Sequence, residues 1–260
     1  MIHFVFPIYN EKENLSGLIA GIRRAMAGRA YRIVAVDDGS NDGSLELLQE
    51  LRNDDLVITG SIMNMNVGAV FSAGIYEALK GAAEDDVIVI MESDQTSEQE
   101  LILPMAKRIT SGEADIVVAS RYLPGGRHVN FPLPRLVFSH CANWLMRVFF
   151  PLASVHDYTI FFRAYRAGIL KKASRYFGPF GLIQSKGFVA NAELLIKLAL
   201  FTNRIAEVPF VYNYGKKKGA SKIHIIRTIN EYFVLINYMN RIFRKVEDFK
   251  KRKNIRGEIL

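Results

Sequence analysis

Apolar runs and amphipathic stretches alternate along the first 120 residues of the chain. Short runs in which nearly every residue is apolar predict strands that are buried on both faces of a sheet. These runs fall within residues 2–8, 31–40, 56–61, 87–91 and 116–120. Stretches with apolar residues at helical spacing predict helices at 13–27, 44–52, 70–81 and 101–110. Such alternation indicates βαβ units, so we expect an α/β fold with a mostly parallel central sheet flanked by helices.

Two stretches in the rest of the chain are amphipathic. The first lies near residues 135–152, where apolar residues recur at helical spacing and His140 and Arg147 interrupt them. The second begins at residue 223 and leads into a basic tail, because residues 241–260 hold 8 Lys or Arg against 3 Asp or Glu. Neither approaches the roughly 20 apolar residues that a membrane-spanning helix needs. Both patterns fit helices that lie in a membrane interface, but the first also fits a helix packed on the core and the second a helix packed in a dimer.

Charge divides the chain into two unequal halves. Residues 1–120 hold 9 Lys or Arg against 19 Asp or Glu, whereas residues 121–260 hold 25 against 7. The basic half indicates an anionic partner such as phosphates, an acidic lipid surface or nucleic acid. No nucleic-acid-binding motif occurs, so we expect no nucleic acid among the partners. The N-terminal apolar run is too short for a signal peptide, and the single cysteine, Cys141, excludes an internal disulfide, so we expect a cytoplasmic protein.

Polar side chains follow several predicted strands at the point where each strand ends. Ligands of parallel sheets bind at the carboxyl ends of the strands, so these residues are candidates for one shared site. They are Tyr9, Asn10, Glu11, Asp37, Asp38, Glu92, Asp94 and Arg121. Residues 37–44 also fit a turn that caps a helix. The glycine motifs of dinucleotide-binding and P-loop proteins are absent, which argues against nicotinamide-dependent redox and P-loop ATPase chemistry.

Glu92 and Asp94 stand one residue apart at the end of an apolar strand. Without a cation the two carboxylates would repel each other, and the pKa of one would rise. On an extended segment Ser93 turns away, so both carboxylates can reach one hard divalent cation that also binds phosphate oxygens. We therefore predict a site for Mg²⁺ or Mn²⁺ at Glu92 and Asp94.

Several motifs occur in the order and spacing of a known family. They are FPIYNEKENL, VDDGSNDGS, GAVFSAG, MESDQ and ASRYLPGG, followed by HDYTIFFRAYR, KGFVANAELLIKLA and EVPFVYNYGKKKGASKI. The first five resemble the nucleotide-sugar domain of the GT-A family 2 glycosyltransferases, and the later three resemble the dolichol-phosphate mannose synthase branch, which includes polyprenyl-phosphate glycosyl synthases. The resemblance spans roughly residues 2–223. It implies a GT-A catalytic domain at 1–222, with a nucleotide-binding half at 1–120 and an acceptor half at 121–222, and then an amphipathic helix and basic tail at 223–260.

The resemblance also implies roles for individual residues. Nucleotide-sugar binding is implied for Pro7, Tyr9, Glu11, Asp37, Asp38, Gly68, Glu92, Ser93, Asp94 and Lys216. Acceptor-phosphate binding is implied for Arg121, Arg163, Ser221 and Lys222, and a direct part in catalysis for Asp94, Arg121 and Lys222. Glu92 stands where the family usually has Asp, and Thr96 where relatives often have Gln. Ile160 and Phe161 replace the Ser and Gly that usually precede the Phe-Arg pair.

The expected reaction depends on the acceptor side. Family members that transfer to sugars usually carry a carboxylate base in a Glu-Asp pair, but here Glu193 is followed by Leu. A phosphate acceptor is already anionic and needs cations instead of a base. We expect an inverting, metal-dependent enzyme that moves a hexose from a GDP- or UDP-linked sugar to a polyprenyl phosphate, undecaprenyl or dolichyl, as a peripheral protein on the inner face of the membrane. Transfer to a carbohydrate or glycolipid hydroxyl, with Glu193 or the His156–Asp157 pair as base, stays open, as does a membrane-protein partner or a homo-oligomer.

Overall fold

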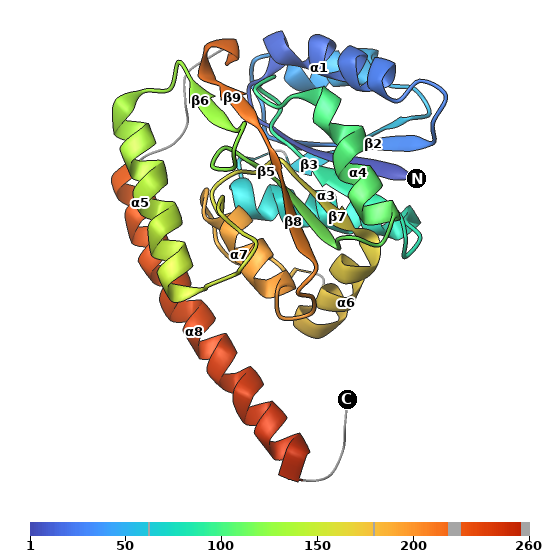
Figure 1. Ribbon diagram of the computed structural model, residues 1–260. Helices are drawn as coiled ribbons and strands as arrows, with labels where there is room; N and C mark the ends of the chain where they lie inside the picture. The colour runs from blue at the N-terminus through green and yellow to red at the C-terminus, as the bar shows by residue number, and fades with distance from the viewer. Residues whose placement is uncertain (62, 179, 218–224, 256–260) are drawn as a thin grey trace.

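The computed structural model describes residues 1–61, 63–178, 180–217 and 225–255, the last ten of these by their backbone alone. Its centre is a seven-stranded sheet with the order β3-β2-β1-β4-β7-β5-β8, and β6 and β9 form a small second sheet (Figure 1). The strands are β1 (Ile2–Ile8), β2 (Tyr31–Asp38), β3 (Leu56–Ser61), β4 (Val87–Ile90), β5 (Ile116–Ser120), β6 (Arg127–Val129), β7 (Arg163–Arg166), β8 (Ile205–Pro209) and β9 (Val211–Asn213). All neighbouring strands are parallel except β7, which is antiparallel to β4 and β5. The predicted α/β class with a mostly parallel sheet is confirmed.

Helices connect the strands and cover the sheet. They are α1 (Lys12–Ala25), α2 (Ser44–Glu50), α3 (Val67–Gly81), α4 (Ile102–Thr110), α5 (Leu133–Phe149), α6 (Ala167–Phe177), α7 (Ala190–Leu198) and α8 (Ile225–Ile255), with short 3₁₀ turns at Gln99–Leu101 and Tyr214–Lys216. The chain moves outward from β1 to β2 to β3 and then returns to β4 on the other side of β1. Crossovers between parallel strands are right-handed, so the face on which a connecting helix lies depends on the direction of the step along the sheet. The steps from β1 to β2 and from β2 to β3 place α1 and α2 on one face, and the return from β3 to β4 places α3 on the other. The order of the strands therefore reverses between β1 and β4, and such a reversal is where parallel sheets bind ligands.

Buried apolar side chains on both faces hold the sheet together. Every residue of β4 and β5 is buried, as expected for strands covered by helices on both sides. The helix predicted to start at residue 70 begins at Val67, because the side chain of Asn66 accepts a hydrogen bond from the backbone N–H of Ala69 at 3.1 Å and so caps it. The strand β7 was not predicted, since its sequence RAYR begins and ends with Arg and has no apolar run.

The two amphipathic stretches form α5 and α8, which pack against each other at one side of the sheet (Figure 1). The far end of α8 extends beyond the rest of the molecule (Figure 1). Within the described ranges, none of the helices combines the length and the apolar character that crossing a membrane requires.

Candidate active site

One cavity lies at the carboxyl ends of the strands, next to the reversal between β1 and β4. Its wall comes from the segments after β1, β4 and β5, from the ends of β2 and α3, and from α5, β9 and α8. The lining residues are Pro7, Ile8, Tyr9, Glu11, Asp38, Val67, Val70, Phe71, Glu92, Ser93, Asp94, Arg121, Phe131, Arg135, Phe138, Ser139, Thr159, Ile160, Phe161, Phe188, Tyr212, Tyr214, Lys217, Thr228 and Tyr232. The polar residues that follow four strands thus meet in one place, as the strand pattern predicted.

Most of the residues predicted for nucleotide-sugar binding line this cavity. They are Pro7, Tyr9, Glu11, Asp38, Glu92, Ser93 and Asp94. Arg121, predicted for the acceptor phosphate, also lines it. Four other predicted residues, Asp37, Gly68, Arg163 and Lys216, are not among the lining residues. Ser221 and Lys222 lie outside the described residues.

Asp37 and Gly68 have structural surroundings that explain their residue types without a nucleotide. The buried Asp37 accepts a hydrogen bond from the backbone N–H of Ser40 at 3.1 Å, which closes the turn after β2. A Cβ at Gly68 would lie 1.8 Å from the carbonyl oxygen of Ser185, so no other residue fits without moving that loop. The packing of α3 against Ser185 is thus sufficient to require glycine at this position, and its role beside a nucleotide stays a prediction.

The acidic end of the cavity is formed by Glu92 and Asp94. The side chain of Ser93 turns away from the two carboxylates, as predicted, and its hydroxyl donates to the carbonyl of Pro7 at 2.8 Å. One oxygen of Asp94, Oδ1, accepts from the N–H and the hydroxyl of Thr96 at 3.2 and 2.6 Å. Glu92 Oε2 accepts from the hydroxyl of Ser97 at 3.0 Å. Both carboxylates are thereby oriented by their own loop.

The two carboxylates suit a divalent cation that is shared with a ligand. In the parts of the chain that the structure describes, no group of three or more His, Cys, Asp or Glu could hold a metal ion alone. Mg²⁺ needs no such group, because one or two carboxylates plus substrate phosphates and water complete its shell. The ammonium of Lys217 forms an ion pair with Asp94 Oδ2, which shows that this oxygen accepts a cation. The donor set therefore fits Mg²⁺ or Mn²⁺ bound together with a diphosphate.

Burial, and secondarily the charge of Asp94, raises the pKa of Glu92 to about 7. In the unfolded chain the pKa is near the usual 4.5, so between these values the folded protein binds more protons than the unfolded one. The free energy of unfolding of the metal-free protein should therefore fall as the pH rises through this window, by up to about 3 kcal/mol. Urea denaturation in EDTA at pH 5 and pH 8 measures this loss. Glu92→Gln should lose less stability between the two pH values than the original protein, and an equal loss in both would contradict the prediction.

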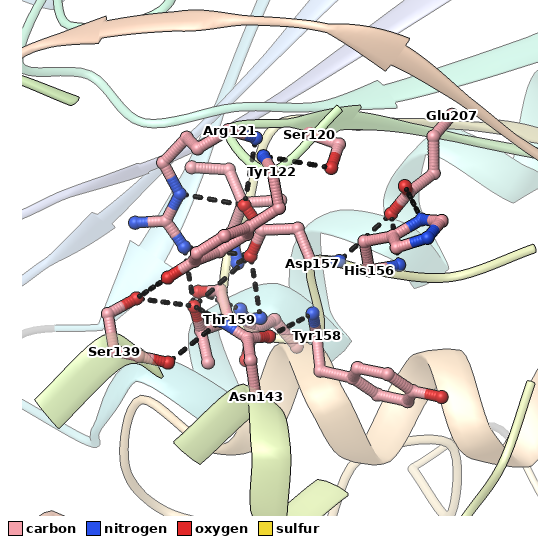
Figure 2. Close-up of polar contacts among 12 residues, drawn as sticks. Ser120, Arg121, Tyr122, Ser139, Asn143, His156, Asp157, Tyr158, Thr159 and Glu207 are labelled. Atoms are coloured by element: carbon pink, nitrogen blue, oxygen red, sulfur yellow. Dashed lines mark hydrogen bonds and ion pairs between the residues drawn. The ribbon is translucent and has the colours of Figure 1, made fainter. Parts of the chain in front are cut away.

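Arg121 is held at the cavity by a buried carboxylate (Figure 2). Its Nε and Nη2 each donate to one oxygen of Asp157 at 2.7 Å, and its backbone N–H donates to Asp157 at 3.2 Å. Burial opposes the charge on Asp157, but Arg121 outweighs this effect and the pKa of Asp157 is lowered. Asp157 also accepts from the N–H of Thr159 at 3.1 Å and of Ile160 at 3.2 Å. The pair thus fixes both the guanidinium and the loop that forms one wall of the cavity.

Arg163 lies behind that wall and is fully buried. Its guanidinium donates to the backbone carbonyls of Asn191 and, at 2.9 Å, of Tyr158. It therefore supports the loop from inside, and does not face the cavity where an acceptor phosphate would bind.

Sequence reasoning missed two of the basic residues in the cavity, Lys217 and Arg135. Lys217 pairs with Asp94, whereas its neighbour Lys216 is exposed. Arg135 belongs to α5, and its guanidinium lies 5.5 Å from the ring centre of Tyr214. Nothing in the sequence indicates which lysine of the Lys216–Lys218 run turns inward, whereas Arg135 could have been found as a cation on the buried side of an amphipathic helix.

The other end of the cavity is apolar and aromatic. Phe161 stacks on Phe71 with ring centres 4.8 Å apart, and Phe188 meets Phe161 edge-on at 6.1 Å. Phe138 of α5 and Tyr232 of α8 complete this wall, with ring centres 6.2 Å apart. The long apolar residues Ile160 and Phe161, which replace Ser and Gly of the motif, thus form part of the cavity surface.

The carboxylate considered as a base, Glu193, is fully buried outside the cavity. It forms a 2.5 Å ion pair with Lys197 and accepts hydrogen bonds from the backbone N–H groups of Gln184 and Ser185. The second candidate base, His156, pairs with Glu207 at 2.8 Å and does not line the cavity either. Both carboxylates, Glu193 and Glu207, serve to hold loops.

Comparisons with known proteins agree with this geometry. The family model described as Glycosyl transferase family 2 matches residues 4–174. The chain is 31% identical to polyprenol monophosphomannose synthase of Mycolicibacterium smegmatis, covering 84% of this chain and 79% of that protein. It is also 31% identical to dolichol-phosphate mannosyltransferase of Pyrococcus furiosus, covering 89% of this chain but only 61% of that protein.

The fold is also that of solved structures. Glucosyl-3-phosphoglycerate synthase from Mycobacterium tuberculosis, in complex with Mn²⁺, uridine diphosphate and glucosyl-3-phosphoglycerate, superimposes with a TM-score of 0.61. The match covers 91% of this chain and 77% of that one at 15% sequence identity, so the similarity is one of fold.

Proposed function

The chain belongs to glycosyl transferase family 2 and has the GT-A fold that its motifs predicted, and on this basis we propose that it transfers a sugar from a nucleotide sugar to a polyprenyl phosphate. In this reaction a phosphate oxygen of the lipid attacks the anomeric carbon of the sugar from the side opposite the leaving group. The bond from that carbon to the diphosphate breaks, and the nucleoside diphosphate leaves with the bonding electrons. The configuration at the anomeric carbon is inverted.

The observation that carries the proposal is the distribution of charge within one cavity. The strand ends supply acidic side chains, namely Glu11, Asp38, Glu92 and Asp94. The segment after β5 and helix α5 supply the cations Arg121 and Arg135, and both lie beside aromatic rings. A donor diphosphate with its metal fits the first part, and a phosphate with an apolar tail fits the second. The relatives named as polyprenol and dolichol-phosphate mannose enzymes support the same acceptor class.

Transfer to a hydroxyl needs a carboxylate or histidine near the acceptor to remove its proton. Among the described lining residues, every carboxylate belongs to the acidic end, and no histidine lines the cavity. Glu193 and His156 are engaged elsewhere. A phosphate needs no deprotonation, which favours the lipid phosphate over a carbohydrate hydroxyl.

We propose that Mg²⁺ or Mn²⁺ binds at Asp94, with Glu92 beside it. The metal would neutralise the charge that develops on the departing diphosphate. Tyr9, Glu11 and Asp38 would bind the nucleoside, and Arg121 would orient the attacking phosphate because its planar fork is fixed by Asp157.

The surface of α5 and α8 favours attachment to a membrane. Both helices expose large apolar side chains, which are Leu133, Val137, Trp144, Val148 and Phe149 on α5 and Ile226, Ile229, Phe233 and Val234 on α8. The same two helices line the aromatic end of the cavity. A peripheral helix pair of this kind would place the acceptor wall next to the acyl chains on the inner face of the membrane.

The proposal is tested by the dependence of nucleotide release on the lipid phosphate. Purified protein is incubated with GDP- and UDP-sugars and Mg²⁺ or Mn²⁺, with undecaprenyl phosphate, with undecaprenol or with oligosaccharides. We expect release with one donor only when the phosphorylated lipid is present. Equal turnover with undecaprenol, or turnover on an oligosaccharide without lipid, would contradict it.

A further inference from the structure

We propose that Lys217 occupies the cation position at Asp94 in the metal-free enzyme and gives it up when metal and donor diphosphate enter together. This inference rests on the proposed use of a metal and a diphosphate donor, but it is independent of the acceptor. It makes the binding of metal and diphosphate mutually dependent.

The contacts of Asp94 leave one oxygen for a cation. Oδ1 is taken by both hydrogen bonds from Thr96, and Oδ2 carries the ion pair with Lys217. The side chains are largely buried, with 7% of Asp94 and 16% of Lys217 exposed. Two cations on one buried carboxylate oxygen repel each other strongly, because little water screens them. A metal at Oδ2 therefore requires the ammonium to move.

Lys217 reaches the site from a segment that backbone hydrogen bonds hold in place. Its backbone N–H donates to the carbonyl of Tyr214 at 3.1 Å, and the 3₁₀ turn before it is capped by Asn213, which accepts from the N–H of Gly215 at 3.0 Å. That turn follows β9, which pairs with β6. Of the two lysines of this run that the structure describes, Lys216 is exposed and Lys217 turns inward. A flexible lysine stem allows the ammonium to swing while the backbone stays in place.

A donor diphosphate offers the displaced ammonium a second anion close to the first. Metal alone must break the Lys217–Asp94 pair without compensation, whereas metal with diphosphate replaces that pair by an ammonium–phosphate pair. The two ligands therefore bind with positive coupling, and each lowers the dissociation constant of the other. The enzyme therefore binds metal more weakly without the donor than with it.

The test is Mn²⁺ binding, measured from the EPR signal of free Mn²⁺ without any nucleotide, sugar or lipid. Removing the competing ammonium in Lys217→Met should lower the Kd for Mn²⁺ about tenfold, within the usual range of couplings between sites. Lys216→Met is the matched control and should change that Kd by less than about twofold, because exposed charges interact weakly. Lys217→Arg keeps the charge and should behave like the original protein.

A second measurement gives the coupling itself. The Kd of UDP or GDP, whichever binds, is determined by calorimetry with and without saturating Mn²⁺. The factor by which Mn²⁺ lowers the Kd of the nucleotide should be about tenfold smaller in Lys217→Met than in the original protein. Unchanged or weaker Mn²⁺ binding by Lys217→Met, or no Mn²⁺ binding by any of these proteins, would overturn the inference. A failure of transfer to undecaprenyl phosphate would leave these binding results intact, so the two proposals fail separately.

Discussion

Replacing Asp94 by Asn is expected to lower kcat/KM for sugar transfer by about 10²- to 10³-fold, comparable to the loss of one strong electrostatic contact in other enzymes. The amide keeps the shape of the side chain and can still accept the two hydrogen bonds from Thr96. It lacks the charge that would hold a divalent cation against the donor diphosphate. The measurement is nucleotide release with saturating undecaprenyl phosphate.

The control for this experiment is Glu100→Gln. Glu100 is an exposed carboxylate in the 3₁₀ turn that follows Asp94 between β4 and α4, and it does not line the cavity. The activity of the Glu100→Gln protein should therefore stay within about twofold of that of the original protein. Thermal denaturation in EDTA should show that Asp94→Asn is folded. If Asp94→Asn keeps more than a tenth of the activity, the proposal that the metal binds at the acidic end of the cavity is wrong.

The position of the site could be predicted from sequence because it follows from topology. Apolar strands that alternate with helices imply a parallel sheet, and the carboxyl ends of its strands meet at one edge. Tyr9, Asp38, Glu92 and Arg121 each follow or end such a strand, so their meeting needs no knowledge of tertiary packing. Glu92 and Asp94 are one residue apart at the end of such a strand, so a site for a divalent cation could also be predicted from sequence.

The roles of other residues depend on packing between distant segments, which a local pattern does not contain. A Cβ at Gly68 would meet Ser185, 117 positions later in the chain, and no local pattern contains that contact. Arg163 belongs to a strand that sits between β4 and β5 only in the folded sheet, where backbone carbonyls take up its guanidinium. Which of Lys216 and Lys217 faces Asp94 is likewise set by the turn after β9.

The buried pair of Arg121 and Asp157 leads to the largest expected loss of stability. Asp157 has no exposed surface, and only 7% of Arg121 is exposed. Asp157→Asn would leave the guanidinium without its counter-charge in the interior, and breaking a buried pair in this way costs about 3–5 kcal/mol of the free energy of unfolding. The backbone N–H groups of Thr159 and Ile160 would keep at most one oxygen as acceptor. Urea denaturation followed by circular dichroism measures the change.

The matched control is Asp85→Asn, which breaks another Asp–Arg contact of the same sheet. Asp85 pairs with Arg166 at 2.7 Å, but its side chain is 88% exposed, so the change should cost less than about 1 kcal/mol. Because Arg121 lines the cavity, Asp157→Asn should also lower kcat/KM at temperatures where it is fully folded, whereas Asp85→Asn should not. Equal destabilisation by the two substitutions would mean that Thr159 and the surrounding dipoles, and not Asp157, compensate the charge of Arg121. In that case Asp157 would not fix the orientation of the Arg121 guanidinium, and a fixed orientation could not be the reason why Arg121 binds the acceptor phosphate.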